Sequence, residues 1–146
     1  MSESDTEGLL AFLITLIQDI NFKISLASLK IITTLYRRQA VNSQKHLGTL
    51  VNSLVEKLSD SKSVVRDAVL ECCALLIDQI SPANFLSQIH KSFTNSNWHV
   101  REGLQILLAR CLIETAEAEQ DTSALMSFKV MQELVSALKL EDKAKL

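Results

Sequence analysis

Few residues of the chain are of types that carry out catalysis or bind metals, and they are scattered. Among 146 residues there are three cysteines, three histidines and three glycines. Cys72 and Cys73 are adjacent, so on a helix they point about 100° apart, and neither a CxxC pair nor a histidine pair at ligand spacing accompanies them. The dispersed glycines cannot cradle a phosphate, and the chain has no nucleophile-elbow motif. We therefore expect no catalytic residue, no metal and no cofactor.

The residues suited to contact a partner lie instead beside short polar breaks between apolar segments. Phe22 and Lys23 follow the break at 18–21, Lys62 follows the break at 59–61, and Trp98 and His99 follow the break at 94–97. An aromatic residue at such a place either anchors a partner or packs under its own loop. Lysines at matching breaks would attract an acidic partner along one edge, although an ordinary solvated lysine has the same sequence signature.

Helices must position these breaks. Apolar residues recur at i, i+3, i+4 and i+7 along nearly the whole chain, which is typical of helices with one buried face. Gly and Pro are too scarce, at three and one, for the many tight turns of an all-β fold. An apolar content of 47% is too high for a disordered chain. We expect seven helices, the first capped by Asp5 or Thr6, the third by Asn42 or Ser43, and the last starting at Ser123 after an acidic loop at 114–122.

The helices form pairs, and the breaks within the first three pairs align. The aligned segments are 19–27, 60–68 and 95–103, separated by 41 and 35 residues. A period of about 40 residues with two helices per unit predicts an all-α fold, an α-solenoid of HEAT-like helical hairpins. An acidic tail at 1–6 would precede repeats at 7–40, 43–80 and 82–117, with an incomplete repeat at 123–146. That unfinished end would be covered by further repeats or by a partner.

Each column of the alignment has a physical interpretation. The first column is expected to cap the second helix of its pair, and the second to be β-branched core. The third is a polar column, whose two arginines would form a ladder of charges between repeats with Asp67 and Glu102. The fourth consists of small residues that allow close approach of neighbouring helices. In that order the columns are Asp19, Asp60 and Asn95; Ile24, Val65 and Val100; Ser25, Arg66 and Arg101; and Ala27, Ala68 and Gly103.

The segment 92–104 resembles the third HEAT repeat of TOG domains, and of their CLASP and crescerin branches in particular. The run Asn97-Trp98-His99-Val100-Arg101-Glu102-Gly103-Leu104 carries this resemblance. The segment 58–66 is similar to the second TOG repeat, and the break at 19–23 lies where TOG domains often carry an aromatic-basic pair. Phe22 stands here in place of Trp, and His99 in place of a frequent Arg. A complete TOG domain has more repeats than this chain.

The resemblance implies a paddle of stacked hairpins whose edge of loops within repeats binds αβ-tubulin. It implies a non-enzymatic module that regulates microtubule dynamics in the cytoplasm, at the microtubule cytoskeleton of a spindle, centrosome or cilium. The tubulin-binding candidates on this chain are Phe22, Lys23, Ser61, Lys62, Ser63, Asn97, Trp98, His99 and Arg101. Trp98 lies in the core register of its repeat, which favours support of the loop over direct contact.

Other interpretations stay open. A HEAT scaffold for a different protein would use its helix faces or its uncovered end rather than the breaks. A HEAT-fold enzyme or DNA-repair protein would need basic residues and a carboxylate along one face, and the net charge of −2 disfavours a nucleic-acid partner. The chain could also be a remnant that binds nothing.

The cysteines and the N-terminal segment bear on localisation. An odd number of cysteines, two of them adjacent, does not make a disulfide framework and fits a reducing compartment. Cys72 and Cys111 fall in apolar registers and are expected to be small core residues. Residues 1–7 are acidic, unlike a secretory signal, and the apolar run at 9–17 is shorter than the ~20 residues of a membrane helix. We expect a cytoplasmic protein without a membrane partner.

Overall fold

The computed structural model describes residues 2–117. This part of the chain contains six α-helices and a short 3-10 helix, and no strand. In chain order they are α1 Glu3–Ile17, α2 Phe22–Arg37, α3 Leu47–Lys57, α4 Ser63–Ile80, α5 Pro82–Ile89, η1 His90–Thr94 and α6 Trp98–Glu117. The predicted incomplete repeat at 123–146, and with it the expected covering of the C-terminal end, lies outside the described residues.

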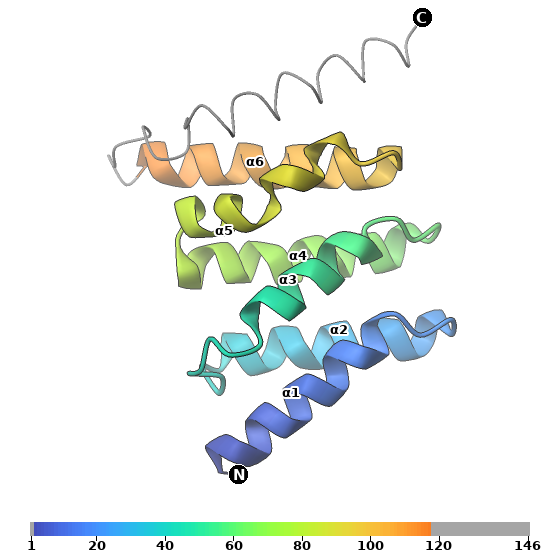
Figure 1. Cartoon of the computed structure of the whole chain (residues 1–146), viewed down its shortest axis with the longest axis vertical. Coiled ribbons are helices and arrows are strands. Elements are labelled where there is room, and N and C mark those ends of the chain that lie inside the picture. Colours follow the sequence, from blue (N-terminus) through green and yellow to red (C-terminus); the bar gives the residue numbers. More distant parts are fainter. Residues whose placement is uncertain (1, 118–146) are drawn as a thin grey trace, which may run out of the picture.

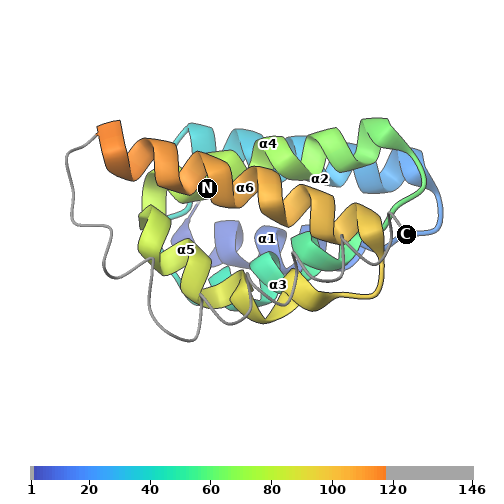
Figure 2. The same cartoon turned by 90° about the horizontal axis from the view of Figure 1, so that it is seen from above.

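The helices stack as three pairs, one above the other (Figure 1). The first helix or helices of each pair, α1, α3 and α5 with η1, form one layer, and α2, α4 and α6 form the other (Figure 2). Within the second layer α4 packs against both α2 and α6. This arrangement confirms the predicted all-α solenoid of helical hairpins.

The core runs without interruption through the three pairs. Val65, Phe85, Phe93 and Val100 are at most 1% exposed and join the layers. Ile24, which the repeat alignment places in the same column as Val65 and Val100, is 40% exposed, so its assignment to the core is wrong. Its helix is in the first pair, and no pair of the described part lies on its outer side.

The small-residue column allows close packing where a previous pair exists. Gly103 in α6 is buried, and a Cβ built there would lie 3.0 Å from both terminal carbons of Leu58, just after α3. A side chain at this position would therefore displace Leu58 or separate the second and third pairs. Ala27, in the same column of the first pair, is exposed.

Three predicted boundaries differ from the structure. Helix α1 begins at Glu3, because Ser2 and Asp5 form a capping box, so residues 3–6 form its first turn rather than a tail. Helix α3 begins at Leu47, five residues after Asn42 and four after Ser43, the two predicted caps. Helix α6 continues through Glu117, into the segment predicted to be an acidic loop from 114.

Candidate loop-edge interface

The three loops within pairs lie along one edge of the stack. They comprise residues 18–21, 58–62 and 95–97, and each leads into the second helix of its pair. We call these residues, with the first two residues of α2, α4 and α6, the loop edge. In Figure 1 the three loops project from the same side, opposite the connection at 38–46. The fold thus brings together candidate residues that are up to 79 positions apart in the sequence, from Phe22 to Arg101.

Each loop is held by the same turn. The side-chain oxygen of Asp19 accepts a hydrogen bond from the backbone N–H of Asn21 at 2.8 Å. Asp60 accepts one from Lys62, and Asn95 one from Asn97, at the same distance. In every case the helix begins three residues after the turn-forming residue. The first column of the alignment is therefore a column of Asx turns, which shape the backbone before the helix.

The helix caps lie two residues beyond the predicted ones. Asn21 is the N-cap of α2, and its side chain accepts from the backbone N–H of Lys23 at 3.0 Å. Asn97 accepts in the same way from His99 at 2.9 Å. Lys62 caps α4 without a side-chain hydrogen bond. Asp19, Asp60 and Asn95 were expected to be the caps, and this assignment is wrong because their oxygens are used in the turns.

The fourth residue of each second helix ties the loop down. Ser25 is buried and its hydroxyl donates to the carbonyl of Ile17 at 2.7 Å. The guanidinium of Arg66 donates to the carbonyl of Asp60 at 2.7 Å. The guanidinium of Arg101, whose residue is 7% exposed, donates to the carbonyls of Asn95 at 2.9 Å and Ser96 at 3.0 Å. These contacts place Arg101 beneath the loop rather than at its surface.

The predicted charge ladder between repeats is wrong for Arg66, which binds the loop of its own pair. Ion pairs between successive pairs of helices occur at other positions, within the layer of α2, α4 and α6. Arg37 in α2 lies 3.0 Å from Glu71 in α4, and Arg110 in α6 lies 3.6 Å from Asp78 in α4. These side chains are about half exposed or more, so each pair contributes little to stability.

An ion pair that the sequence interpretation missed fixes the second loop. Lys57 Nζ lies 3.0 Å from Asp60 Oδ2, and the two side chains are only 11% and 15% exposed. Partial burial acts to raise the pKa of Asp60, but hydrogen bonds from Lys62 and Lys57 and the charges of both lysines outweigh it and hold this pKa below its usual value. The i, i+3 spacing of Lys57 and Asp60 was the available sequence signal.

The first two loops are linked through Phe22. The Nζ atom of Lys62 lies 4.6 Å from the centroid of the Phe22 ring, within the range of a cation–π interaction. Phe22 itself is partly buried against the core. Its ring therefore packs under the loops and presents its remaining surface, together with the exposed Lys23 and Lys62, at the loop edge.

Two exposed apolar residues of the loop edge were not singled out in the sequence. Ile20, in the first loop, is fully exposed, and Val64, the second residue of α4, is 47% exposed. The signal for Ile20 was an isoleucine inside a polar break, and the signal for Val64 was a Val-Val pair of which only Val65 can face the core. An apolar side chain held in solvent on a braced loop is suited to enter a pocket of a partner.

The third loop presents Trp98. This residue is 55% exposed, so the expectation that it lies in the core register is wrong. Its ring stacks on the imidazole of His99, with centroids 3.6 Å apart and planes tilted by 31°. Ser61 and Ser63 in the second loop region are exposed as well, whereas Asn97 is partly buried and serves as a cap. Of the nine candidates, Asn97 and Arg101 hold the edge in shape and the other seven have surface to offer.

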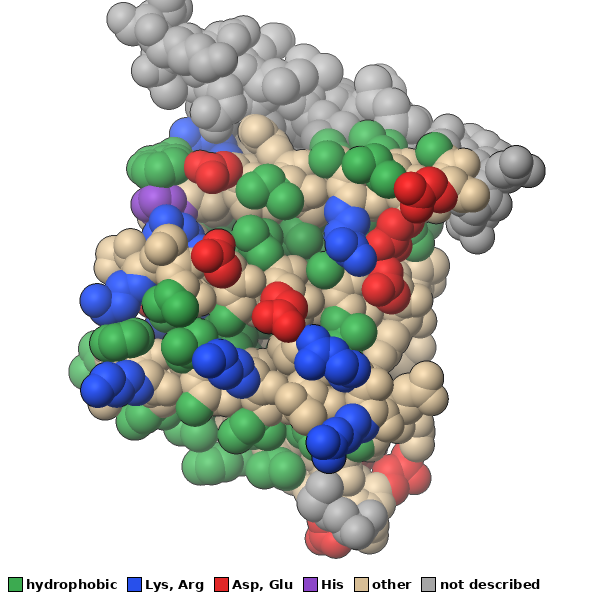
Figure 3. All heavy atoms as spheres, turned by 180° about the vertical axis from the view of Figure 1, so that it is seen from behind, with side chains coloured by type: hydrophobic (Ala, Val, Ile, Leu, Met, Phe, Trp, Pro, Cys, Tyr) green, Lys and Arg blue, Asp and Glu red, His purple; other side chains and the backbone are tan. Residues whose placement is uncertain are grey.

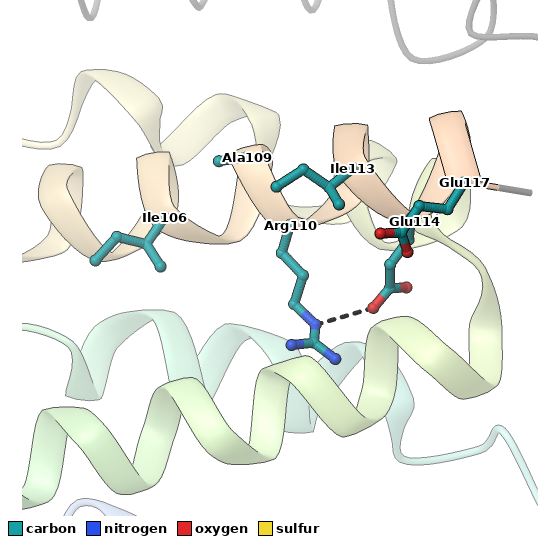
Figure 4. Close-up of a pocket in the computed structure, with 6 residues that line it drawn as sticks. All are labelled: Ile106, Ala109, Arg110, Ile113, Glu114 and Glu117. Atoms are coloured by element: carbon teal, nitrogen blue, oxygen red, sulfur yellow. Dashed lines mark ion pairs between the residues drawn. The ribbon is translucent and has the colours of Figure 1, made fainter.

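Two hollows lie near the ends of α6. One of about 260 Å³ lies between the first halves of α4 and α6, and Ser63, Arg66 and His99 are among its lining residues. The other, of about 380 Å³, lies at the far end of α6 from the loop edge, where Ile106 and Ile113 flank Arg110 (Figure 4). There Arg110 Nε lies 3.0 Å from Glu114 Oε1. Burial and the neighbouring Asp78 raise the pKa of Glu114, which Arg110 partly offsets.

Within residues 2–117, no group of three or more His, Cys, Asp or Glu side chains is placed to hold a metal ion. No helix in this part of the chain is both long and apolar enough to cross a membrane.

The chain is similar to curated proteins of the TOG and CLASP groups. It is 25% identical over 130 residues to "TOG array regulator of axonemal microtubules protein 1" of Mus musculus. The aligned residues make up 89% of this chain and 7% of that protein. It is 28% identical over 103 residues to "CLIP-associated protein" of Arabidopsis thaliana, covering 70% of this chain and 7% of that protein. It is 27% identical over 108 residues to "CLIP-associating protein 1-B" of Xenopus laevis, covering 73% and 7%.

No family model matches the chain. The chain spans about 7% of the length of these curated relatives. Similarity at low identity over most of the chain supports a partial TOG-like domain, in agreement with the resemblance of the segment 92–104.

Proposed function

We propose that this chain is a non-enzymatic, microtubule-related binding module whose loop edge contacts tubulin. The observation that carries the proposal is the shared construction of the three loops. Each loop has an Asx turn, and a helix begins three residues after the turn-forming residue. The fourth residue of that helix is polar and donates a hydrogen bond to a backbone carbonyl, either at the end of the preceding helix or in the loop. Such bracing keeps the exposed side chains in place before a partner arrives, which lowers the entropy cost of binding.

The surface chemistry of the loop edge supports a protein partner. Ile20, Trp98 and part of Phe22 offer apolar and aromatic contact, and Lys23 and Lys62 add positive charge beside them. Aromatic anchors surrounded by charged groups are typical of residues that dominate protein–protein binding. The similarity to a protein named as a regulator of axonemal microtubules favours tubulin as that partner. We propose a cytoplasmic location at the microtubule cytoskeleton on the same grounds.

Co-elution with αβ-tubulin on size exclusion tests the proposal. The variant Phe22→Ala with Lys62→Ala removes both partners of the cation–π contact at the loop edge. Its matched control is Phe12→Ala with Lys45→Ala, which removes one exposed aromatic ring and one exposed lysine elsewhere. We expect wild type and control to co-elute and the loop-edge variant to lose at least about tenfold in affinity. Equal co-elution of all three proteins would contradict the proposal.

A further inference from the structure

Helix α2 exposes a seam of the kind that helices use to pack on one another. Ile24 and Ile31 are 40% and 44% exposed, and Ala27 and Thr34 between and after them are exposed too. Their spacing alternates three and four residues, which keeps them on one stripe of a helix. We call Ile24, Ala27, Ile31 and Thr34 the α2 seam. Ile24, Ala27 and Ile31 lie toward the outer side of the first pair, whereas Thr34 also lines a hollow between α2 and α4 with Ala68 and Glu71.

The same positions are contact positions in the other two pairs. By the repeat alignment, Ile24, Ala27 and Ile31 correspond to Val65, Ala68 and Cys72 in α4, and to Val100, Gly103 and Leu107 in α6. Val65, Cys72, Val100 and Leu107 are all at most 1% exposed.

These equivalents face the preceding pair of helices. Cys72 lies close to Thr33 in α2: burial raises the pKa of its thiol, and the neighbouring Thr33 side chain partly offsets this. Gly103 lies against Leu58 at the end of α3. The α2 seam is thus shaped for a helix that residues 2–117 do not supply.

The charge beside the seam restricts what that helix can be. Lys23, Lys30 and Arg37 recur every seven residues on one side of the seam, and α2 has no acidic residue. The residues of α4 that correspond to Lys30 and Arg37 are Glu71 and Asp78. Figure 3 shows basic side chains along α2, and acidic side chains together with some basic ones over α4 and α6. Within the described part of the chain, Arg37 pairs with Glu71, and Lys23 and Lys30 have no ion pair.

We propose that the α2 seam is a docking site for an acidic amphipathic helix of a partner protein. Apolar residues of that helix would cover Ile24 and Ile31, and its carboxylates would lie opposite Lys23 and Lys30. Two copies of this chain joined seam to seam would oppose two rows of cations, so charge disfavours that occupant. The proposal concerns a helix face and does not depend on tubulin binding by the loop edge.

A fluorescent synthetic helix tests this with the full chain. The probe carries Leu at seam positions, spaced alternately three and four residues apart, and Glu at the flanking positions. One control peptide has Lys for every Glu, and a second has Ser for every Leu. By fluorescence anisotropy we expect only the Glu-Leu peptide to bind. We expect Lys30→Glu to weaken that binding at least about fivefold, and Ile31→Gln to weaken it by a comparable factor.

Matched variants separate this surface from general charge and from misfolding. Lys45→Glu makes the same charge change away from the seam and should leave the affinity unchanged. Lys30→Glu should also gain affinity for the Lys-containing peptide, a reversal that an unfolded protein cannot give. Circular dichroism and thermal melting check that both seam variants stay folded.

Three results would overturn the proposal. The first is equal binding of the acidic and basic peptides. The second is an affinity that Lys45→Glu lowers as much as Lys30→Glu does. The third is a wild-type dimer in solution that Ile31→Gln dissociates, because a second copy would then occupy the seam. Lys30 and Ile31 lie outside the loop edge, so none of these results bears on tubulin binding.

Discussion

Asp60 supports both the second loop and the helix before it. It accepts a hydrogen bond from the exposed backbone N–H of Lys62 and forms an ion pair with Lys57, and the side chains of this ion pair are largely shielded from solvent. Its pKa is lowered in the folded state, because these interactions outweigh the effect of burial. The stabilisation from its charge is therefore present above the unfolded-state pKa and is lost as the pH falls through the folded-state pKa.

The variant Asp60→Asn isolates that charge, since its amide oxygen can still accept from Lys62. We expect the free energy of unfolding at pH 7 to fall by about 1–2 kcal/mol, and the difference from wild type to shrink below about pH 4. Urea denaturation at several pH values measures both effects. Asp19→Asn is the matched control, because Asp19 makes the same turn in the first loop without an ion pair in the described part of the chain. The same pH dependence in both variants would contradict this account.

The three cysteines are core residues, as the sequence indicates for Cys72 and Cys111. Burial raises the pKa of Cys72 to about 11 and of Cys111 to about 12, and raises that of Cys73 well above its ordinary value. Thiolate is the reactive form, so we expect none of the three to react with a thiol reagent at pH 8 until the protein unfolds. Ser61→Cys should add one fast-reacting thiol and serves as the positive control. Rapid labelling of a native thiol in wild type would show that the core is open.

At the scale of single elements, Arg66 is the brace of the second loop. Its guanidinium bridges from the first turn of α4 to the carbonyl of Asp60. We expect Arg66→Met, which keeps much of the apolar stem, to cost about 1–2 kcal/mol and to speed hydrogen exchange at the backbone N–H of Lys62. Arg38→Met, at an exposed site outside the loop edge, is the control. If exchange in the loop stays unchanged while only global stability falls, Arg66 does not act as a loop brace.

The sequence was sufficient to locate the loops but not to assign each residue of them. Polar breaks interrupt the helical periodicity sharply, so the positions of 19, 60 and 95 could be aligned and the second helices begin at equivalent residues. Whether a side-chain oxygen forms the Asx turn or caps the helix depends on where the backbone places the N–H group two residues later. Asp19 and Asn21 are chemically alike, and only the structure separates their roles.

Exposure was harder to predict than periodicity. Ile24 and Val65 occupy the same column, yet one is 40% exposed and the other is buried. The difference comes from the neighbouring pair, which α4 has and α2 lacks on its outer side within residues 2–117. Ile20 was missed and Trp98 was assigned to the core for a related reason. A loop, or the start of the helix that follows it, can hold an apolar side chain in solvent against the usual trend.

At the scale of the whole molecule, stability depends on contacts between successive pairs, as in other repeat proteins. Leu58 is 1% exposed and lies against Gly103 of the next pair. We expect Leu58→Ala to reduce the free energy of unfolding by about 2–5 kcal/mol, because it leaves a cavity at this junction. Ile31→Ala, on the exposed α2 seam, should cost less than about 1 kcal/mol. Equal losses in urea denaturation would mean that Leu58 does not join the pairs as described.

The central claim is that the loop edge is the surface that meets tubulin, and a hydrogen-exchange footprint of the full chain with αβ-tubulin tests it most directly. We predict slower exchange on tubulin addition at 18–23, 58–64 and 95–99, with no change at 38–46 on the opposite edge. Protection confined to 38–46, or to helix faces outside the loop edge, would contradict the claim.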